Sequence, residues 1–76
     1  NVAMGYAALN ANTTAHRNIA YGGSALQNTT TGSQNTAIGH EAMLSNTTGY
    51  DNVAVGQQAL YANTDAINNT AVGYDA

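Results

Sequence analysis

The stretch Asn35-Thr36-Ala37-Ile38-Gly39 sets the pattern of the whole chain, because close copies of it return at a fixed interval. Each copy starts 17 residues after the one before, and the other copies begin at Asn1, Asn18, Asn52 and Asn69. A short phrase repeated at constant spacing indicates a solenoid, in which every repeat forms one coil. We therefore expect one domain, residues 1–76, with coils 1–17, 18–34, 35–51 and 52–68 and a partial coil 69–76. Because no cap is recognisable at either end, we expect the chain to be an excerpt of a longer fibrous protein.

Within each repeat, numbered from position 1 to position 17, four positions are identical in all five copies: Asn at 1, Ala at 3, Gly at 5 and Ala at 8. Stacked asparagine amides can bond to each other and to the backbone along a solenoid, so position 1 predicts a structural ladder. Its members are Asn1, Asn18, Asn35, Asn52 and Asn69. Positions 3 and 5 predict close packing against another backbone, at Ala3, Gly5, Ala20, Gly22, Ala37, Gly39, Ala54, Gly56, Ala71 and Gly73.

Positions 2 to 5 predict a strand. Positions 2 and 4 are mostly bulky and share one face of an extended segment, while the small residues at 3 and 5 share the other. The Ala-Leu pair at positions 8 and 9 predicts a second short strand, and an Asn-Thr block then predicts a polar turn. The expected fold is all-β: a β-solenoid, or β-roll, of 17-residue coils with two short strands per coil.

Composition argues against several functions. The chain has one Lys or Arg and a net charge of −3, which disfavours binding to nucleic acid. No apolar run is long enough for a transmembrane helix, so we expect no membrane insertion of this segment. His40-Glu41 resembles the start of a zinc motif, but Leu44 stands where the second histidine is required. There is no cysteine, nucleotide-binding loop or recurring carboxylate pair, so we expect no enzyme, no metal and no cofactor.

Sizeable apolar side chains occupy only positions 2, 4 and 9 of each coil, which makes a very thin core. We therefore expect several chains to pack side by side as a homo-oligomer. Tyr21 stands at position 4 and is expected in the core. The pattern leaves open whether positions 2 and 4 face the interior of the coil or the axis of an oligomer.

The phrase Asn-x-Ala-Ile/Val-Gly followed by x-x-Ala resembles the head repeats of trimeric autotransporter adhesins, which form the YadA-like left-handed β-roll. It is carried by 35–39 with Ala42, by 52–56 with Ala59, and by their equivalents in the other coils. It is also similar to repeats of phage and virus tail fibres. The family's coils are usually shorter, so the Asn-Thr block is interpreted as an enlarged corner. The resemblance implies a homotrimer, outside the cell, on a cell surface or virion.

These patterns predict a non-enzymatic structural or adhesive fibre module of a bacterial surface adhesin or phage tail fibre. Its candidate partners are a cell-surface glycan or a matrix protein. Exposed tyrosines are candidate platforms for sugars, namely Tyr6, Tyr50, Tyr61 and Tyr74. The residues predicted to face a ligand are Tyr50, Asp51, Tyr61 and Asp65. Two alternatives stay open: a self-assembling extracellular filament, and an ice-binding solenoid that uses the row Thr13, Thr30, Thr47 and Thr64.

Overall fold

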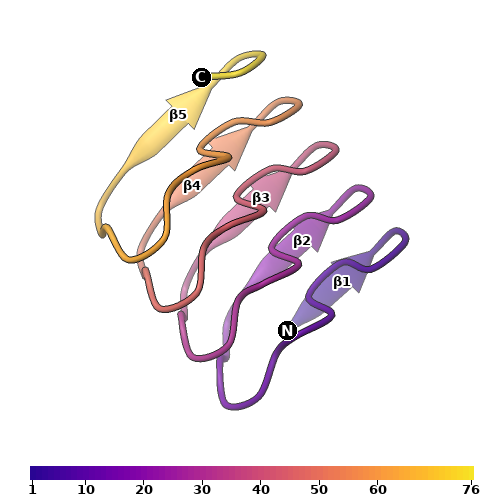
Figure 1. Ribbon diagram of the computed structural model, residues 1–76, viewed down its shortest axis with the longest axis vertical. Coiled ribbons are helices and arrows are strands. Elements are labelled where there is room, and N and C mark those ends of the chain that lie inside the picture. Colours follow the sequence, from indigo (N-terminus) through magenta and orange to yellow (C-terminus); the bar gives the residue numbers. More distant parts are fainter.

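A computed structural model, which describes all 76 residues, shows a parallel β-solenoid (Figure 1). Each coil contributes one strand of three residues to a single sheet of five strands, in the order β1-β2-β3-β4-β5. The strands are β1 (Val2–Met4), β2 (Ile19–Tyr21), β3 (Thr36–Ile38), β4 (Val53–Val55) and β5 (Thr70–Val72). Neighbouring strands pair in parallel, each residue with the one 17 positions away, as Ala20 does with Ala37. The predicted all-β solenoid of 17-residue coils is confirmed.

The prediction of two strands per coil is wrong, because the segment around Ala8 and Leu9 is a turn. The backbone φ of Leu9 is +53°, and that of its counterpart Leu26 is +51°, in the left-handed region that an extended strand cannot use. The segment is nevertheless bonded to its neighbour, since Leu26 N–H donates to the carbonyl of Ala42 at 3.0 Å. Coils are therefore joined by backbone hydrogen bonds here as well, but around a bend.

Left-handed residues at fixed places reverse the direction of the chain within each coil. Position 5 is always glycine and has φ between +126° and +133°, which side-chain-bearing residues rarely adopt. Positions 7, 9 and 17 also have positive φ but are never glycine; in the third coil these are Glu41, Met43 and Asp51. Such residues cost energy individually, and they persist where surrounding contacts hold them. The inter-coil hydrogen bonds supply those contacts, so the bends recur in register.

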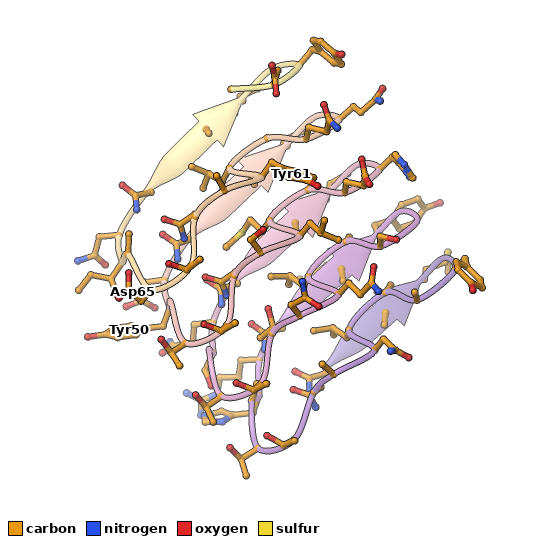
Figure 2. All side chains as sticks on the ribbon, viewed as in Figure 1. Tyr50, Tyr61 and Asp65 are labelled. Atoms are coloured by element: carbon orange, nitrogen blue, oxygen red, sulfur yellow. The ribbon has the colours of Figure 1, made fainter.

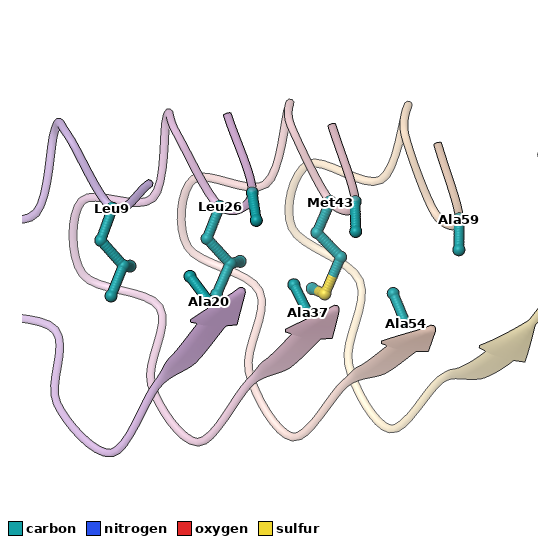
Figure 3. Packing of buried hydrophobic residues seen from close by; sticks show 9 residues of the cluster. Leu9, Ala20, Leu26, Ala37, Met43, Ala54 and Ala59 are labelled. Atoms are coloured by element: carbon teal, nitrogen blue, oxygen red, sulfur yellow. The ribbon is translucent and has the colours of Figure 1, made fainter. Parts of the chain in front are cut away.

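The apolar half of the coil interior lies between the strands and the turn at positions 8 and 9. The strand alanines at position 3, such as Ala37, point toward the position 9 side chains, such as Met43 (Figure 3). Ala20, Ala37 and Ala54 are fully buried, as are Leu26 and Met43. The two sides of the coil approach closely because only a methyl group projects inward from the middle of each strand.

The bulky strand positions 2 and 4 lie on the outside of the coil. Successive side chains of a strand point to opposite faces, so positions 2 and 4 point away from the face of the buried alanine at position 3. Ile38 at position 4 is accordingly 41% exposed. Tyr21, which we expected in the core, is 55% exposed. That expectation is wrong because the interior has room for alanine at the strand and for one larger side chain, at position 9. The question left open by the sequence is answered: positions 2 and 4 face away from the coil interior.

A row of polar side chains lies inside the coils at position 12. It is formed by Asn12, Thr29, Asn46 and Asn63. Asn63 Nδ2 donates to Asn46 Oδ1 at 3.3 Å, and Asn46 Nδ2 donates to Thr29 Oγ1 at 3.3 Å. Thr29 Oγ1 instead donates to the carbonyl of Asn46 at 3.2 Å. Asn12 Oδ1 is consequently buried without a hydrogen-bond partner. The row is interrupted where threonine replaces asparagine.

Thr29→Asn is expected to raise the free energy of unfolding by about 1 kcal/mol, because a new amide can donate to Asn12 Oδ1 and accept from Asn46 Nδ2. Thr29→Val, which removes the hydroxyl and keeps the shape, should lower the free energy by a similar amount. Chemical denaturation of the two variants and the parent chain measures both effects. A Thr29→Asn variant no more stable than the parent would contradict this description of the row.

Candidate functional site

The side chains available to a partner lie on the outer faces of the coils. The structure encloses no pocket, and no cluster of three His, Cys, Asp or Glu side chains is placed to hold a metal ion. None of its segments is a helix with the length and apolar character needed to span a membrane. Three of these surfaces are prominent: the sheet, the corner that leads back to the strand, and the edge formed by the loops after the strands.

The asparagines at position 1 directly precede the strands, and their side chains bond successive coils together. Asn35 N–H donates to Asn18 Oδ1 at 2.9 Å, and Asn52 N–H donates to Asn35 Oδ1 at 3.1 Å. Each amide also reaches across its own coil: Asn35 Nδ2 donates to the carbonyl of Gly49 at 2.8 Å. Asn18, Asn35 and Asn52 are buried. Their amides bond to the backbone of their own coil and of the next coil, as a structural ladder requires.

The outer sheet face comprises positions 2 and 4 of all five strands: Val2, Met4, Ile19, Tyr21, Thr36, Ile38, Val53, Val55, Thr70 and Val72. None of these residues is charged, and eight of them are apolar or aromatic. The parallel register places equivalent residues directly beside one another, as with Ile38 and Val55. The face is thus a continuous apolar surface along the whole solenoid. Large exposed apolar patches of this kind typically mark interaction sites.

The residues predicted to face a ligand do not form one group. Tyr50, Asp51 and Asp65 are exposed and occupy the corner turn that leads back to a strand. Figure 2 shows Tyr50 and Asp65 at the same corner of the solenoid, with Tyr61 well apart from both. Tyr61 belongs instead to the turn that follows the position 9 bend. Any ligand at the corner would therefore meet one tyrosine and the two carboxylates.

The same corner holds a pair that the sequence reasoning missed. Ser33 Oγ lies 3.3 Å from His16 Nδ1 and accepts a hydrogen bond from the backbone N–H of His16 at 3.1 Å. The two residues are 17 positions apart, so reading equal positions of neighbouring coils together would have found them. Both lie on the outer surface, and Ser33 Oγ also donates to the carbonyl of Thr31. The pair fastens one coil to the next.

Three of the four threonines of the ice-binding alternative donate their hydroxyl hydrogen within the protein. Thr13 Oγ1 donates to the carbonyl of Thr30 at 3.0 Å, and Thr30 Oγ1 donates to the carbonyl of Thr47 at 3.4 Å. Thr47 Oγ1 makes the same bond to Thr64. These hydroxyl groups point along the axis from coil to coil. A row of free hydroxyls facing solvent is therefore not what this position provides.

Comparison with known proteins finds no matching family model, no matching curated protein and no matching solved structure. The function of the chain is accordingly inferred from the geometry of its outer faces.

Proposed function

We propose that this solenoid is a non-enzymatic structural or adhesive module of an extracellular fibre, assembled as a homotrimer. The resemblance of its repeats to adhesin heads and tail-fibre repeats favours a bacterial cell surface or a virion as its location. In this role the coils supply a rod with a repeating outer surface. Surface glycans are the ligand class that we assign to its adhesive function.

The observation that carries the proposal is the outer sheet face. Burying such a face stabilises an assembly by roughly 25 cal/mol for every Å² of apolar surface removed from water. A second copy of the chain is the partner we favour, because the face is uncharged, runs through every coil and has the same pitch in every copy. Three chains arranged around an axis can bury three such faces together, and the loops and corners then stay outside.

Ile38→Glu is expected to dissociate the assembly, because the substitution places a carboxylate in the middle of the face, where burial without a partner is unfavourable. Sedimentation velocity should then report the monomer. Ile38→Thr, which keeps a β-branched side chain, should weaken the assembly less. Gln57→Glu adds the same charge at an exposed loop and is the matched control.

Circular dichroism on each sample separates dissociation from unfolding. If Ile38→Glu sediments like the parent oligomer while Gln57→Glu dissociates, the outer sheet face is not the interface. If the parent chain and every variant sediment as folded monomers, the trimer itself is disproved.

A self-assembling filament is the second candidate, favoured by the identical hydrogen-bond register between all coils. The surface at one end of a coil is complementary to the surface at the opposite end of its neighbour, and head-to-tail stacking of such surfaces generates open fibres. Electron microscopy distinguishes the two: fibres of constant width that lengthen with concentration support the filament, and discrete particles support the trimer. The ice-binding alternative has less support, because the Thr13-type hydroxyls are bonded to the next coil.

A further inference from the structure

The loops that follow the strands stack into one edge of the solenoid, opposite the corner turns (Figure 1). Position 6 opens each loop and is filled in order by Tyr6, Gly23, His40, Gln57 and Tyr74. We call these residues the loop-edge row. Aromatic rings stand in the first, third and fifth coils, and smaller or non-aromatic residues stand between them. The row therefore offers a ring at every second coil.

Backbone hydrogen bonds fix the pitch of the loop-edge row. Ser24 N–H donates to the carbonyl of Tyr6 at 2.7 Å, and Gln58 N–H donates to the carbonyl of His40 at 2.9 Å. The same bond links every neighbouring pair of loops, so the loops are in register like the strands. At the strand spacing of about 4.8 Å, rings in alternate coils are attached about 10 Å apart. The spacing is a property of the backbone and does not depend on side-chain choice.

The three rings are open to solvent. Tyr6 is 88% exposed, Tyr74 is 72% exposed, and the side chain of His40 is 58% exposed. His40 lies beside Gly23, where an added Cβ would come within 3.0 Å of His40 Nδ1. Glu41 Oε1 lies 3.6 Å from His40 Nε2 and accepts a hydrogen bond from Gln58 Nε2 at 3.0 Å. The middle ring is thus held between a glycine and a hydrogen-bonded carboxylate.

Exposed aromatic rings in a line suit a ligand that presents apolar faces at a regular interval. The C–H face of a pyranose sugar is apolar and stacks on aromatic rings, while its hydroxyl groups need polar neighbours. Glu41 and Gln58 supply donor and acceptor atoms near the His40 ring, and Asp75 adds a carboxylate to the same edge. The acidic character of this edge disfavours anionic polymers. An extended β-1,4-linked chain repeats its orientation every two sugars, over about the length of two coils.

We propose that the loop-edge row binds a neutral, extended polysaccharide with β-1,4 linkages, laid along the solenoid axis so that alternate sugars stack on Tyr6, His40 and Tyr74. This inference deepens the adhesive role proposed above by giving it a site and a ligand class. It replaces the corner around Tyr50 as the site of sugar stacking. The row lies away from the outer sheet face, so binding does not require the trimer.

The test is binding of the purified chain to cellohexaose, followed by NMR line shifts, and co-sedimentation with insoluble cellulose. Maltohexaose has the same sugars in α-1,4 linkage and is the matched ligand control. Tyr6→Ala and Tyr74→Ala should each weaken binding by about two- to tenfold, the range expected for one aromatic stacking contact. Tyr50→Ala and Tyr61→Ala remove exposed tyrosines outside the row and should leave binding unchanged.

Selective binding of cellohexaose that is weakened by Tyr6→Ala and by Tyr74→Ala supports the assignment. Equal binding of maltohexaose, losses confined to Tyr50→Ala or Tyr61→Ala, or no binding of either hexaose would overturn it. Light scattering on the same samples keeps the two proposals separate. A monomer that binds cellohexaose through the row disproves the trimer alone, and a trimer that binds neither hexaose disproves the loop-edge site alone.

Discussion

Gly39→Ala is expected to destabilise the solenoid by at least about 4 kcal/mol, enough to unfold a domain of this size. Gly39 has φ of +131°, and a Cβ at this residue would lie 2.6 Å from the backbone carbonyl carbon and oxygen of Gly56. A methyl group therefore forces the two coils apart. Separation would break the hydrogen bond from Gly56 N–H to the carbonyl of Ile38, which is 2.8 Å long. Thermal unfolding followed by circular dichroism measures the loss.

Gly23→Ala is the matched control for this substitution. Gly23 lies in the loop-edge row, has no positive φ, and an added Cβ would meet only the movable ring of His40. Its midpoint of unfolding should stay within a few degrees of the parent's. If the two variants have the same midpoint of unfolding, the backbone contact and the positive φ at position 5 do not have the effect described.

Asn35→Ala is expected to cost about 3 kcal/mol or more, the second largest effect. The substitution removes the Oδ1 atom that accepts from both the backbone N–H and the Nδ2 of Asn52, each at 3.1 Å. It also removes the 2.8 Å hydrogen bond to the carbonyl of Gly49. Asn52 N–H then stays buried without its partner, and a buried unsatisfied donor is costly. Chemical denaturation gives the free energy of unfolding directly.

Asn28→Ala controls for the loss of an asparagine as such. Asn28 is exposed, because the Asn-Thr block of the second coil begins one residue early and leaves Thr29 at the buried position. Its substitution should change the free energy of unfolding by less than about 0.5 kcal/mol. A comparable loss for both variants would show that position 1 has no special structural role.

The repeat length was enough to predict the solenoid, because only a stacked coil explains an unbroken 17-residue interval of Asn, Ala and Gly. The orientation of the strand was not predictable from the same pattern. Alternation separates two faces but does not say which is inside, and the bulky face at Ile38 would normally be assigned to the core. Here the turn at Met43 lies so close to the strand that only Ala37 fits beneath it.

The bend at positions 8 and 9 was missed for a different reason. Alanine and leucine have little preference for the left-handed backbone conformation, so the sequence Ala25-Leu26 does not predict the φ of +51° found at Leu26. Contacts between coils impose it. The corner residues were correctly predicted to lie on the surface. The repeat pattern, however, does not give the distance across a coil between two different repeat positions. The separation of Tyr61 from Tyr50 therefore had to come from the structure (Figure 2).

Multi-angle light scattering on the folded chain, across a range of concentrations, measures the assembly that the outer sheet face is proposed to form. The chain mass is 7.8 kDa. We expect a single species of three times that mass at every concentration above the dissociation constant of the trimer. A folded species that keeps the mass of one chain at every concentration would contradict the proposal. It would show that the chain folds with its outer sheet face exposed to water and that its copies do not associate through that face.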